Sequence, residues 1–380
     1  MNNQVIVHIS HTDINFDNRI LKEMAALSNV ENFYLHGVGV LENEAIAYKP
    51  NHGLNVDTVS LKSKKFTFFP RPLRYFLNYV EAFFKFLPIL FKLKPAVIHC
   101  HDTLFLPIGF VAKLFLKSKL VYDAHELESQ KNGQSKVLSK ATFLIEKLCW
   151  PKVDFLITVA PAIARWYDKI LGAKKSLVVL NSPEFDPLVF NTGNNNYLRE
   201  YFNIPKDKKI FLYLGIIGKG RSIDLYLDVF NNINVDSHIV FVGYGEYVNK
   251  VKEYSKICSK IHYHPAVKHD EVVKIAKSAD VGLCLIQNVS LSDFYCLPNK
   301  LFEYAFSGLY VLASDFPEMR RVVNQYCLGQ TCDLKEEALT NSINIIEQFE
   351  LASTSKDLTE LSWGKQSQQL VDAYQTLLKN

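Results

Sequence analysis

The chain has 380 residues, of which 48% are hydrophobic and 22% are charged, the balance of an ordinary soluble globular protein. Its formal net charge of +4 is too small to indicate binding to a phosphate backbone, so we expect no nucleic-acid partner. The N-terminal MNNQVIVHIS lacks the pattern of a secretion signal, and no run of ~20 uncharged apolar residues predicts a membrane-spanning helix.

The cysteine pattern indicates the redox state of the protein's cellular compartment. There are seven, none in a Cys-x-x-Cys pair, and several lie in apolar runs such as Cys284 in VGLCLI. An odd number of scattered, buried thiols is typical of a reducing cytoplasm. We therefore expect a cytoplasmic protein without a disulfide framework or a zinc site.

In the first half of the chain, short apolar runs alternate with longer helical patterns. Strands are predicted at residues 5–9, 96–100, 120–122 and 155–159, and helices at roughly 17–28, 72–94, 104–116, 136–149 and 161–171. Alternation of this kind predicts a parallel, doubly wound sheet.

Residues 62–94 are the sharpest compositional anomaly. They hold ten aromatic residues, eight Lys or Arg, and a single acid, Glu81. A basic amphipathic helix with aromatic residues is typical of a segment that binds an anionic membrane surface. The alternative is a helix packed on the first domain's sheet with a solvated basic edge. The basic run continues at Lys62, Lys64 and Lys65, outside the helix, and this favours the membrane.

A break follows at residues 181–208, which are rich in Asn, Pro and Asp, and we place the linker near 182–187. The alternation then resumes, with strands at 210–214, 239–242, 260–263, 281–286 and 310–313, and helices near 222–232, 246–258, 269–278, 299–307 and 334–348. The predicted domains are 1–183 and 184–362, with a last helix at 363–380 that packs back on the first domain. Two such domains would bind a ligand at the carboxyl ends of their strands.

A glycine-rich turn at 211–224, FLYLGIIGKGRSID, connects a buried strand to a helix. Glycine lets the backbone approach an anion closely, and a helix N-terminus offers free N–H groups. Lys219 and Arg221 could neutralise a diphosphate. A glycine turn with two solvated cations explains this segment equally well.

A second segment, 292–318, carries SDFYCLPNKLFEYAFSGLYVLASDFPE. Asn299 is a plausible N-cap after Pro298, and Gly308 would end the helix. Lys300 lies in the first helical turn, where a cation opposes the helix dipole unless an anion is bound there. Glu303 lies one turn later, and a carboxylate can bind both hydroxyls of a ribose.

These segments together resemble the retaining glycosyltransferases of family 4, which have the GT-B fold. VIHCHD at 97–102 looks like the family's segment with its active-site histidine, and LVYDAHE at 120–126 looks like the next strand and loop. YLGIIGKGRS, HIVFVGYG, the helix after Pro298 and SWGKQSQQL follow in the family's order, so the resemblance covers nearly the whole chain. It implies an α/β fold of two facing doubly wound Rossmann-like domains, the second of which binds the donor.

The resemblance also implies roles for individual residues, with three departures. Arg221 stands where the family has its phosphate-binding lysine, and Ile216 where it has an arginine. Tyr295 stands where the first glutamate of Glu-x7-Glu holds the donor sugar, and Asp293 is the nearest carboxylate. The implied catalytic residues are His101, Arg221 and Lys300; the donor-binding residues are Gly215, Gly218, Lys219, Gly243, Val267, Tyr295, Pro298, Asn299 and Glu303; the acceptor-side residues are Asp17, Arg19, His125 and Glu126.

Two histidines, His99 and His101, end one strand. We expect them on opposite faces, one in the core and one toward the crevice, and the resemblance selects His101 as the active-site residue. Without the resemblance, a structural role would be the better interpretation of either one.

The resulting prediction is an enzyme of the retaining hexosyltransferase type. It would move a sugar from a nucleoside diphosphate sugar to a lipid-linked glycan in surface polysaccharide biosynthesis, such as capsule or O-antigen. It would work without a metal or cofactor, as a peripheral protein at the inner face of the plasma membrane. Two alternatives stay open: a non-catalytic membrane-associated binder of nucleotide sugars or glycans, and a nucleotide-sugar epimerase.

Overall fold

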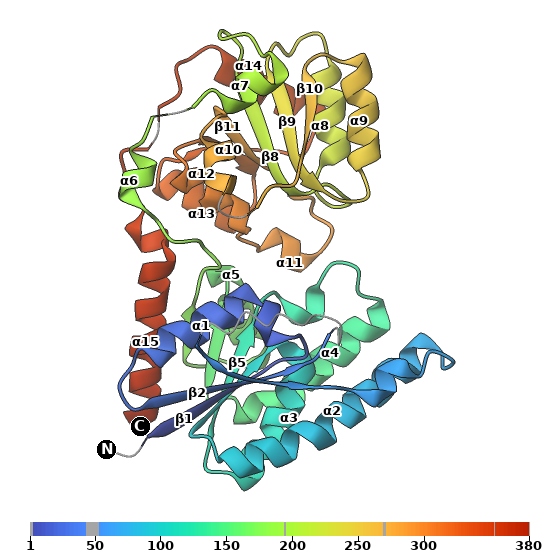
Figure 1. Cartoon of the computed structure of the whole chain (residues 1–380), viewed down its shortest axis with the longest axis vertical. Coiled ribbons are helices and arrows are strands. Elements are labelled where there is room, and N and C mark those ends of the chain that lie inside the picture. The colour runs from blue at the N-terminus through green and yellow to red at the C-terminus, as the bar shows by residue number, and fades with distance from the viewer. Residues whose placement is uncertain (1–2, 43–52, 194, 269–270, 353, 380) are drawn as a thin grey trace. The chain divides into compact units, whose positions relative to one another are not determined.

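The computed structural model describes residues 3–42, 53–193, 195–268, 271–352 and 354–379. The chain forms two compact units (Figure 1). Unit 1 comprises Met1–Val179 and Gln366–Asn380, and unit 2 comprises Leu180–Lys365. The C-terminal residues therefore belong to the same unit as the N-terminal sheet.

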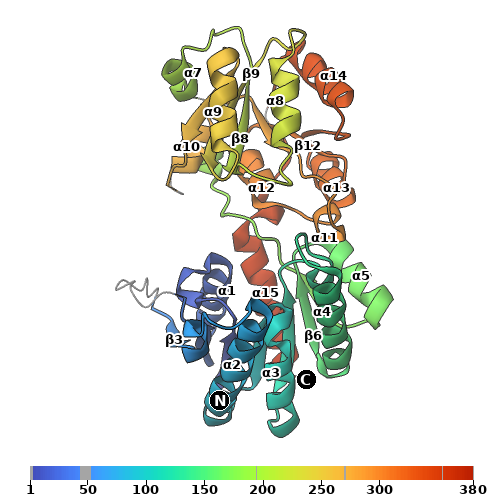
Figure 2. The same ribbon diagram turned by 90° about the vertical axis from the view of Figure 1, so that its right-hand side faces the viewer.

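Unit 1 is built on a seven-stranded parallel sheet in the order β3-β2-β1-β4-β5-β6-β7, seen from two directions in Figures 1 and 2. The order reverses at β1, which pairs with both β2 and β4, as in a doubly wound sheet. The strands are β1 Gln4–Ile9, β2 Phe33–Val40, β3 Asn55–Val59, β4 Val97–His101, β5 Lys119–Ala124, β6 Phe155–Thr158 and β7 Ser176–Val178. The helices are α1 Asn18–Ser28, α2 Arg71–Leu93, α3 Asp102–Phe115, α4 Lys136–Cys149, α5 Pro161–Leu171 and α15 Trp363–Lys379.

Unit 2 is built on a six-stranded parallel sheet in the order β10-β9-β8-β11-β12-β13. Its strands are β8 Ile210–Ile216, β9 His238–Tyr244, β10 Ile261–Pro265, β11 Val281–Cys284, β12 Tyr310–Ser314 and β13 Gly329–Cys332. Its helices are α6 Pro187–Phe190, α7 Tyr197–Phe202, α8 Ile223–Asn231, α9 Val248–Ile257, α10 Val272–Ala276, α11 Leu291–Phe294, α12 Asn299–Phe306, α13 Pro317–Gln325 and α14 Glu336–Glu347. Two Rossmann-like units confirm the predicted fold class.

The predicted strands are confirmed, because the central strands are mostly apolar and buried on both faces. The sequence analysis missed β2, β3, β7 and β13. In β2, Gly37 and Gly39 interrupt the apolar run, yet they are needed there: a Cβ at Gly39 would lie 2.7 Å from the carbonyl oxygen of Thr12. The predicted helix at 269–278 is shorter than expected, and residues 269–270 lie outside the described part of the chain.

The basic aromatic segment forms a short 3-10 turn, Lys62–Lys65, followed by α2. The inner face of α2, which includes Phe86 and Leu90, is buried. Elsewhere on the helix, Tyr75 near its N-terminus is 63% exposed and Phe84 is 69% exposed. None of the helices in the described ranges has both the length and the low charge needed to cross a bilayer.

A glycine in the second sheet fixes the position of α12. In β11, a Cβ at Gly282 would lie 2.2 Å from Cγ of Tyr304, a residue of α12 that is fully buried. The hydroxyl of Tyr304 accepts a hydrogen bond of 2.8 Å from the backbone N–H of Leu214 in β8. Because α12 carries Lys300 and Glu303, this contact sets the depth at which both residues lie.

We predict that Gly282→Ala destabilises the protein by ~1–3 kcal/mol, the usual cost of overpacking a core. Urea denaturation followed by circular dichroism measures the change. Gly193→Ala is the matched control, because no heavy atom lies within 4 Å of a Cβ at that position. Equal stability of the two variants would contradict the prediction.

Candidate active site

The pocket of unit 2 lies where β8 and β9 end and α12 begins. It encloses ≈ 340 Å³. Its apolar and aromatic side includes Tyr213, Val242 and Val267, and its polar side includes Arg221, Lys300 and Glu303. A site with one apolar side and a few convergent charged groups suits a ligand that has both a flat ring and an anionic part.

Glycines hold the strand ends together at this pocket. Gly215 and Gly243 face each other in the β8–β9 register, with φ values of +116° and +156°. A Cβ at Gly243 would lie 1.8 Å from the carbonyl oxygen of Gly215, so no larger residue fits there. Both glycines line the pocket. At Gly243 the close approach of the two strands requires a glycine whether or not a ligand binds.

Lys300 is a buried cation without an acceptor. Its Nζ is buried and has no hydrogen-bond partner among the described residues. It lies 4.1 Å from the centre of the Tyr213 ring, a cation–π contact. Burial, with a contribution from the positive charge of Arg221, lowers the pKa of Lys300 to about 8. An unpaired buried ammonium is costly, and an anion in the pocket would remove that cost.

The start of α12 differs from the expected cap. Asn299 is not the N-cap but the first helical residue, and Pro298 occupies the N-cap position. Proline has no side-chain acceptor, so no side chain caps the first N–H groups of the helix. These groups point their partial positive charge toward the same end of the helix as Lys300. The expectation failed because the helix begins at Asn299, one residue earlier than it would with a capping asparagine at that position.

Most of the predicted donor residues meet at this pocket, and some do not. Gly218, Lys219 and Tyr295 are not among the residues that line it. Lys219 is exposed, and its backbone N–H donates to Glu246 at 3.0 Å. Asp293 accepts a hydrogen bond of 2.7 Å from the hydroxyl of Ser290 at the start of α11. The predicted residues that do line the pocket are Gly215, Arg221, Gly243, Val267, Pro298, Asn299, Lys300 and Glu303.

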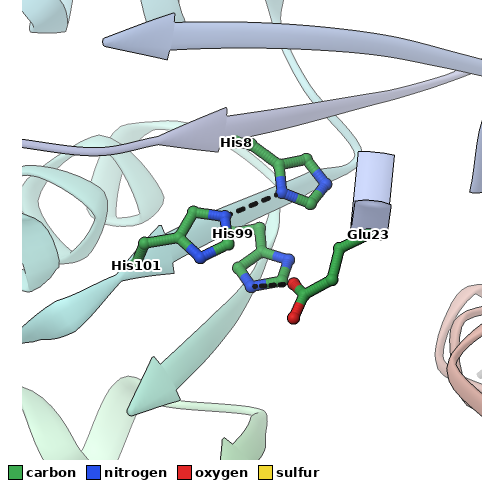
Figure 3. A group of neighbouring side chains, drawn as sticks. All are labelled: His8, Glu23, His99 and His101. Atoms are coloured by element: carbon green, nitrogen blue, oxygen red, sulfur yellow. Dashed lines mark hydrogen bonds and ion pairs between the residues drawn. The ribbon is translucent and has the colours of Figure 1, made fainter. Parts of the chain in front are cut away.

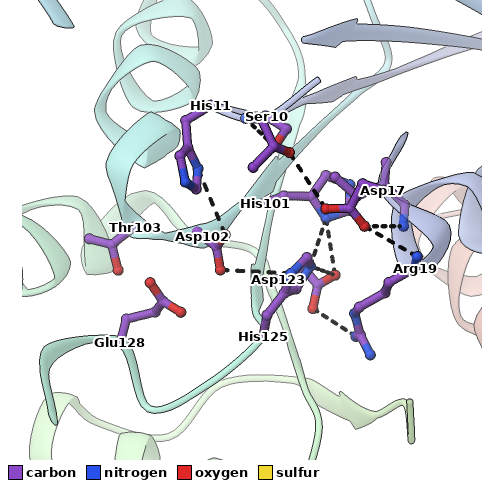
Figure 4. Close-up of polar contacts among 12 residues, drawn as sticks. Ser10, His11, Asp17, Arg19, His101, Asp102, Thr103, Asp123, His125 and Glu128 are labelled. Carbon is purple, nitrogen blue, oxygen red and sulfur yellow. Dashed lines mark hydrogen bonds and ion pairs between the residues drawn. The ribbon is translucent and has the colours of Figure 1, made fainter. Parts of the chain in front are cut away.

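Unit 1 holds a second polar cluster at the carboxyl ends of β4 and β5, shown in Figure 4. Asp123, fully buried in β5, is at its centre. One carboxylate oxygen, Oδ1, accepts a hydrogen bond of 3.1 Å from Arg19. The other, Oδ2, lies 3.2 Å from Nδ1 of His101 and 3.1 Å from Nε2 of His125. One buried carboxylate thus connects three side chains from three elements.

The charges in this cluster depend on one another. Burial would raise the pKa of Asp123, but Arg19 and His125 outweigh burial and hold it well below its usual range. Burial would lower the pKa of His125, but Asp102 and Asp123 raise it to about 9. Glu23, buried and close to Asp123, has its pKa raised to about 8. The cluster therefore balances buried carboxylates against Arg19 and the His125 imidazolium.

The expectation that His99 and His101 lie on opposite faces is wrong. Residues two apart in a strand share a face, and their rings stack with centroids 4.2 Å apart. Figure 3 shows both beside His8 and Glu23. Neither His99 nor His101 has any exposed surface, whereas the side chain of His125 is 18% exposed. Of these three histidines, His125 is therefore the one that a ligand can reach.

The remaining residues predicted on the acceptor side also differ in how exposed they are. Asp17 is the N-cap of α1 and accepts hydrogen bonds from the backbone N–H groups of Arg19 and Ile20. Arg19 is 6% exposed and lies 3.1 Å from Glu23, within the unit. Glu126 is exposed just beyond β5. Sequence reasoning missed Glu23 and Asp123, although a carboxylate at a buried strand or helix position is itself a signal.

Two family models match the chain. The model of Glycosyltransferase Family 4 matches residues 36–182, and the model of Glycosyl transferases group 1 matches residues 195–360. The first lies in unit 1 apart from its last three residues, and the second lies in unit 2. Together they account for most of the chain.

Individual relatives agree with these matches. An uncharacterized glycosyltransferase of Methanocaldococcus jannaschii is 24% identical over 189 residues, which is 46% of each chain, so the match spans about half the length of that relative. Sucrose-phosphate synthase from Thermosynechococcus elongatus has a TM-score of 0.69 at 16% identity, over 97% of this chain and 94% of that one. HepE from Anabaena, in complex with UDP-glucose, has a TM-score of 0.70 at 12% identity, over 98% and 99%. With both units matched, the chain belongs to glycosyltransferase family 4 and has the GT-B fold.

Proposed function

We propose that the protein transfers a sugar from a nucleoside diphosphate sugar, bound in the unit 2 pocket, to a glycan acceptor. The observation that carries the proposal is Lys300. Its buried Nζ has no acceptor in the described part of the chain and lies beside the uncapped N-terminus of α12. A diphosphate supplies the negative charge that this arrangement lacks.

The rest of the pocket suits the other parts of such a donor. The apolar side, with Tyr213, Val242 and Val267, offers surface for the base. Arg221, on the polar side, makes no hydrogen bond or ion pair with the described residues and can add a second cation. Glu303 lines the same pocket, and we propose that its carboxylate binds the ribose hydroxyls. HepE, which shares the fold, was solved with UDP-glucose, and this supports a donor of the same class.

The chemistry follows from where negative charge develops. Cleavage at the anomeric carbon leaves an oxocarbenium-like centre and a diphosphate, so stabilising the diphosphate lowers the barrier. Lys300 and Arg221 supply that stabilisation from side chains, and we propose transfer of a hexosyl group that is independent of metal at the donor. Retention of the anomeric configuration is proposed from the family resemblance.

The direct test is a screen of nucleoside diphosphate sugars, with and without membrane extract, that detects released nucleoside diphosphate and the fate of the sugar.

Each alternative predicts its own result in that screen. A non-catalytic binder would release no nucleoside diphosphate, and an epimerase would alter the sugar without needing membrane extract. Release that depends on the extract, with sugar appearing in the lipid fraction, supports the proposed transfer.

We predict that Lys300→Gln lowers kcat/KM for the donor by ~10²–10³, the usual cost of removing one donor of positive charge to the transition state. The matched control is Lys252→Gln. Lys252 also packs over an aromatic ring, with Nζ 4.8 Å from the centre of the Tyr263 ring, but does not line the pocket. Steady-state kinetics of the two folded variants decide, and equal activity would exclude the assigned role of Lys300.

The pH dependence gives an independent prediction. With its pKa near 8, Lys300 is protonated below that pH and neutral above it. The kcat/KM for the donor should therefore fall as pH rises through about 8, because the neutral amine no longer attracts the diphosphate. Lys300→Arg, whose guanidinium stays charged, should remove this fall. A pH profile that keeps the same fall in the arginine variant would assign it to another group.

We also propose that the acceptor is lipid-linked and that unit 1 binds an anionic membrane surface, as a cytoplasmic peripheral protein of surface polysaccharide biosynthesis. The support is the exposure of apolar groups beside cations. Phe68 is 76% exposed and Phe76 is 62% exposed, and both follow the basic turn at Lys62–Lys65. Aromatic side chains that remain exposed on a basic segment suit the headgroup boundary of a bilayer.

We predict that changing Lys62, Lys65 and Arg71 together to Glu weakens binding to anionic vesicles by ~100-fold or more, since each basic residue near such a surface contributes ~1 kcal/mol. Lys64 is left unchanged because its Nζ donates to the carbonyl of Leu41 at 2.6 Å. The control changes three lysines of α9 to Glu and alters the net charge equally: Lys250, Lys252 and Lys256.

Vesicle co-sedimentation at low and high salt measures the difference. Salt should weaken the binding of the unaltered chain, because such attraction is screened within ~10 Å at 0.1 M. Equal binding by the two triple variants would contradict a membrane role for this segment.

A further inference from the structure

Three side-chain atoms in the unit 1 cluster form a nearly equilateral triangle (Figure 4). The distance from His101 Nδ1 to His125 Nε2 is 3.1 Å, and from His125 Nε2 to Asp123 Oδ2 it is 3.1 Å. The third side, from His101 Nδ1 to Asp123 Oδ2, is 3.2 Å. Two imidazole nitrogens and one carboxylate oxygen thus face a common point.

Hydrogen bonds explain this triangle only in part. Each ring nitrogen carries at most one proton, and the two nitrogens face each other as well as the same carboxylate oxygen. Bonds of ~2.0–2.1 Å from one ion to three atoms so spaced would meet at angles of about 95–105°, between octahedral and tetrahedral geometry. The triangle therefore has the size of one face of a metal coordination shell.

The second atom of each of the three groups is also accounted for. His101 Nε2 lies 2.9 Å from His8 Nδ1, and Asp123 Oδ1 accepts from Arg19 at 3.1 Å. His125 Nδ1 lies 3.8 Å from Oδ1 of Asp102, an electrostatic contact that is too long for a hydrogen bond. Hydrogen-bonded outer partners such as His8 and Arg19 fix the orientation of metal-binding side chains. The arrangement leaves His101 Nδ1, His125 Nε2 and Asp123 Oδ2 directed to one another.

The neighbouring group, His8, Glu23, His99 and His101, is a weaker candidate although its ligand atoms lie within 4.8 Å of one another (Figure 3). The His8 and His99 ring centroids are 4.2 Å apart, as are those of His99 and His101, with interplanar angles of 32° and 22°. The lone pair of an imidazole nitrogen lies in the ring plane, so stacked rings cannot direct their lone pairs at one ion without turning. The rings of His101 and His125 are inclined at 60°, which lets them converge.

We propose that His101, Asp123 and His125 bind a divalent transition-metal ion, with zinc the ion that this set of two imidazoles and one carboxylate suits best. The charged groups that surround the site allow a cation. Asp102 and Asp123 supply negative charge, Arg19 is basic, Lys131 lies 3.9 Å from Asp102, and the metal ion would replace the proton that His125 carries in the free chain. The partly exposed side of His125 leaves room for a fourth ligand from solvent or from a bound hydroxyl. The site departs from the expectation that the protein holds no metal, and it does not depend on the chemistry proposed for the donor.

The test uses the full chain without an affinity tag, dialysed against a chelator and titrated with Zn²⁺ by calorimetry. We expect one zinc per chain. His125→Ala should weaken zinc binding at least 100-fold through loss of a ligand, and Asp102→Asn should weaken it less, through loss of a nearby negative charge. His262→Ala is the control. His262 forms a histidine pair with His238 at 2.9 Å in unit 2 and should leave zinc binding unchanged.

Circular dichroism in chelator confirms that each variant is folded, and zinc-edge anomalous scattering from crystals locates the ion. The inference is overturned if the unaltered chain binds no zinc below ~10 µM, a limit far weaker than that of most structural sites. It is also overturned if the anomalous peak lies among His8, Glu23 and His99, or if the His125 and His262 variants bind equally. Sugar transfer that persists in chelator, together with absent zinc binding, would remove the metal site and leave the proposed function intact.

Discussion

The buried carboxylate of Asp123 is the constraint on which the functional edge of unit 1 depends. It lies in the buried part of β5, where a charge without partners would be unstable, and neighbouring elements supply those partners. Arg19 comes from α1, His101 from β4, and His125 from the loop after β5. Removing one member of such a buried set typically costs ~3–5 kcal/mol, because the others are left without compensation. The same contacts that stabilise the fold therefore orient His125 at the surface.

The constraint extends to the end of the chain. His99, which stacks on His101, accepts or donates a hydrogen bond of 2.6 Å with the hydroxyl of Tyr374 in α15. Tyr374 is fully buried, so α15 is held in unit 1 by a polar contact in addition to its apolar face. This contact explains in physical terms why residues from 366 onward belong to the first unit rather than to the second, from which they follow in sequence.

The sequence predicted the fold and one of the two clusters because the signals involved are local. Apolar runs and helical spacing identify the central strands, and Gly215, Arg221 and Lys300 lie in short motifs whose chemistry can be read directly. Strands β7 and β13 are short or polar and left no such signal. The unit 1 cluster joins residues far apart: His8 and His101 are separated by 93 positions, and His99 and Tyr374 by 275. Their pairing is a product of the tertiary structure, and an error about strand alternation placed His99 and His101 on opposite faces.

The two units hold buried charge in opposite states, and this difference bears on function. In unit 1, Asp123 is satisfied within the protein, so its charges stabilise the free chain and fix geometry. In unit 2, Lys300 is buried against Tyr213 with no acceptor among the described residues, so in its charged form it carries an electrostatic cost that a bound anion would lower. Because an anion pairs with the buried ammonium, the pocket favours the anion-bound state. The attraction is greatest for the state in which the anion carries the most negative charge. For a diphosphate sugar that state follows cleavage of the anomeric bond, when the leaving diphosphate gains negative charge. In the transfer proposed above, Lys300 would therefore attract the diphosphate most strongly at the step in which the sugar leaves it.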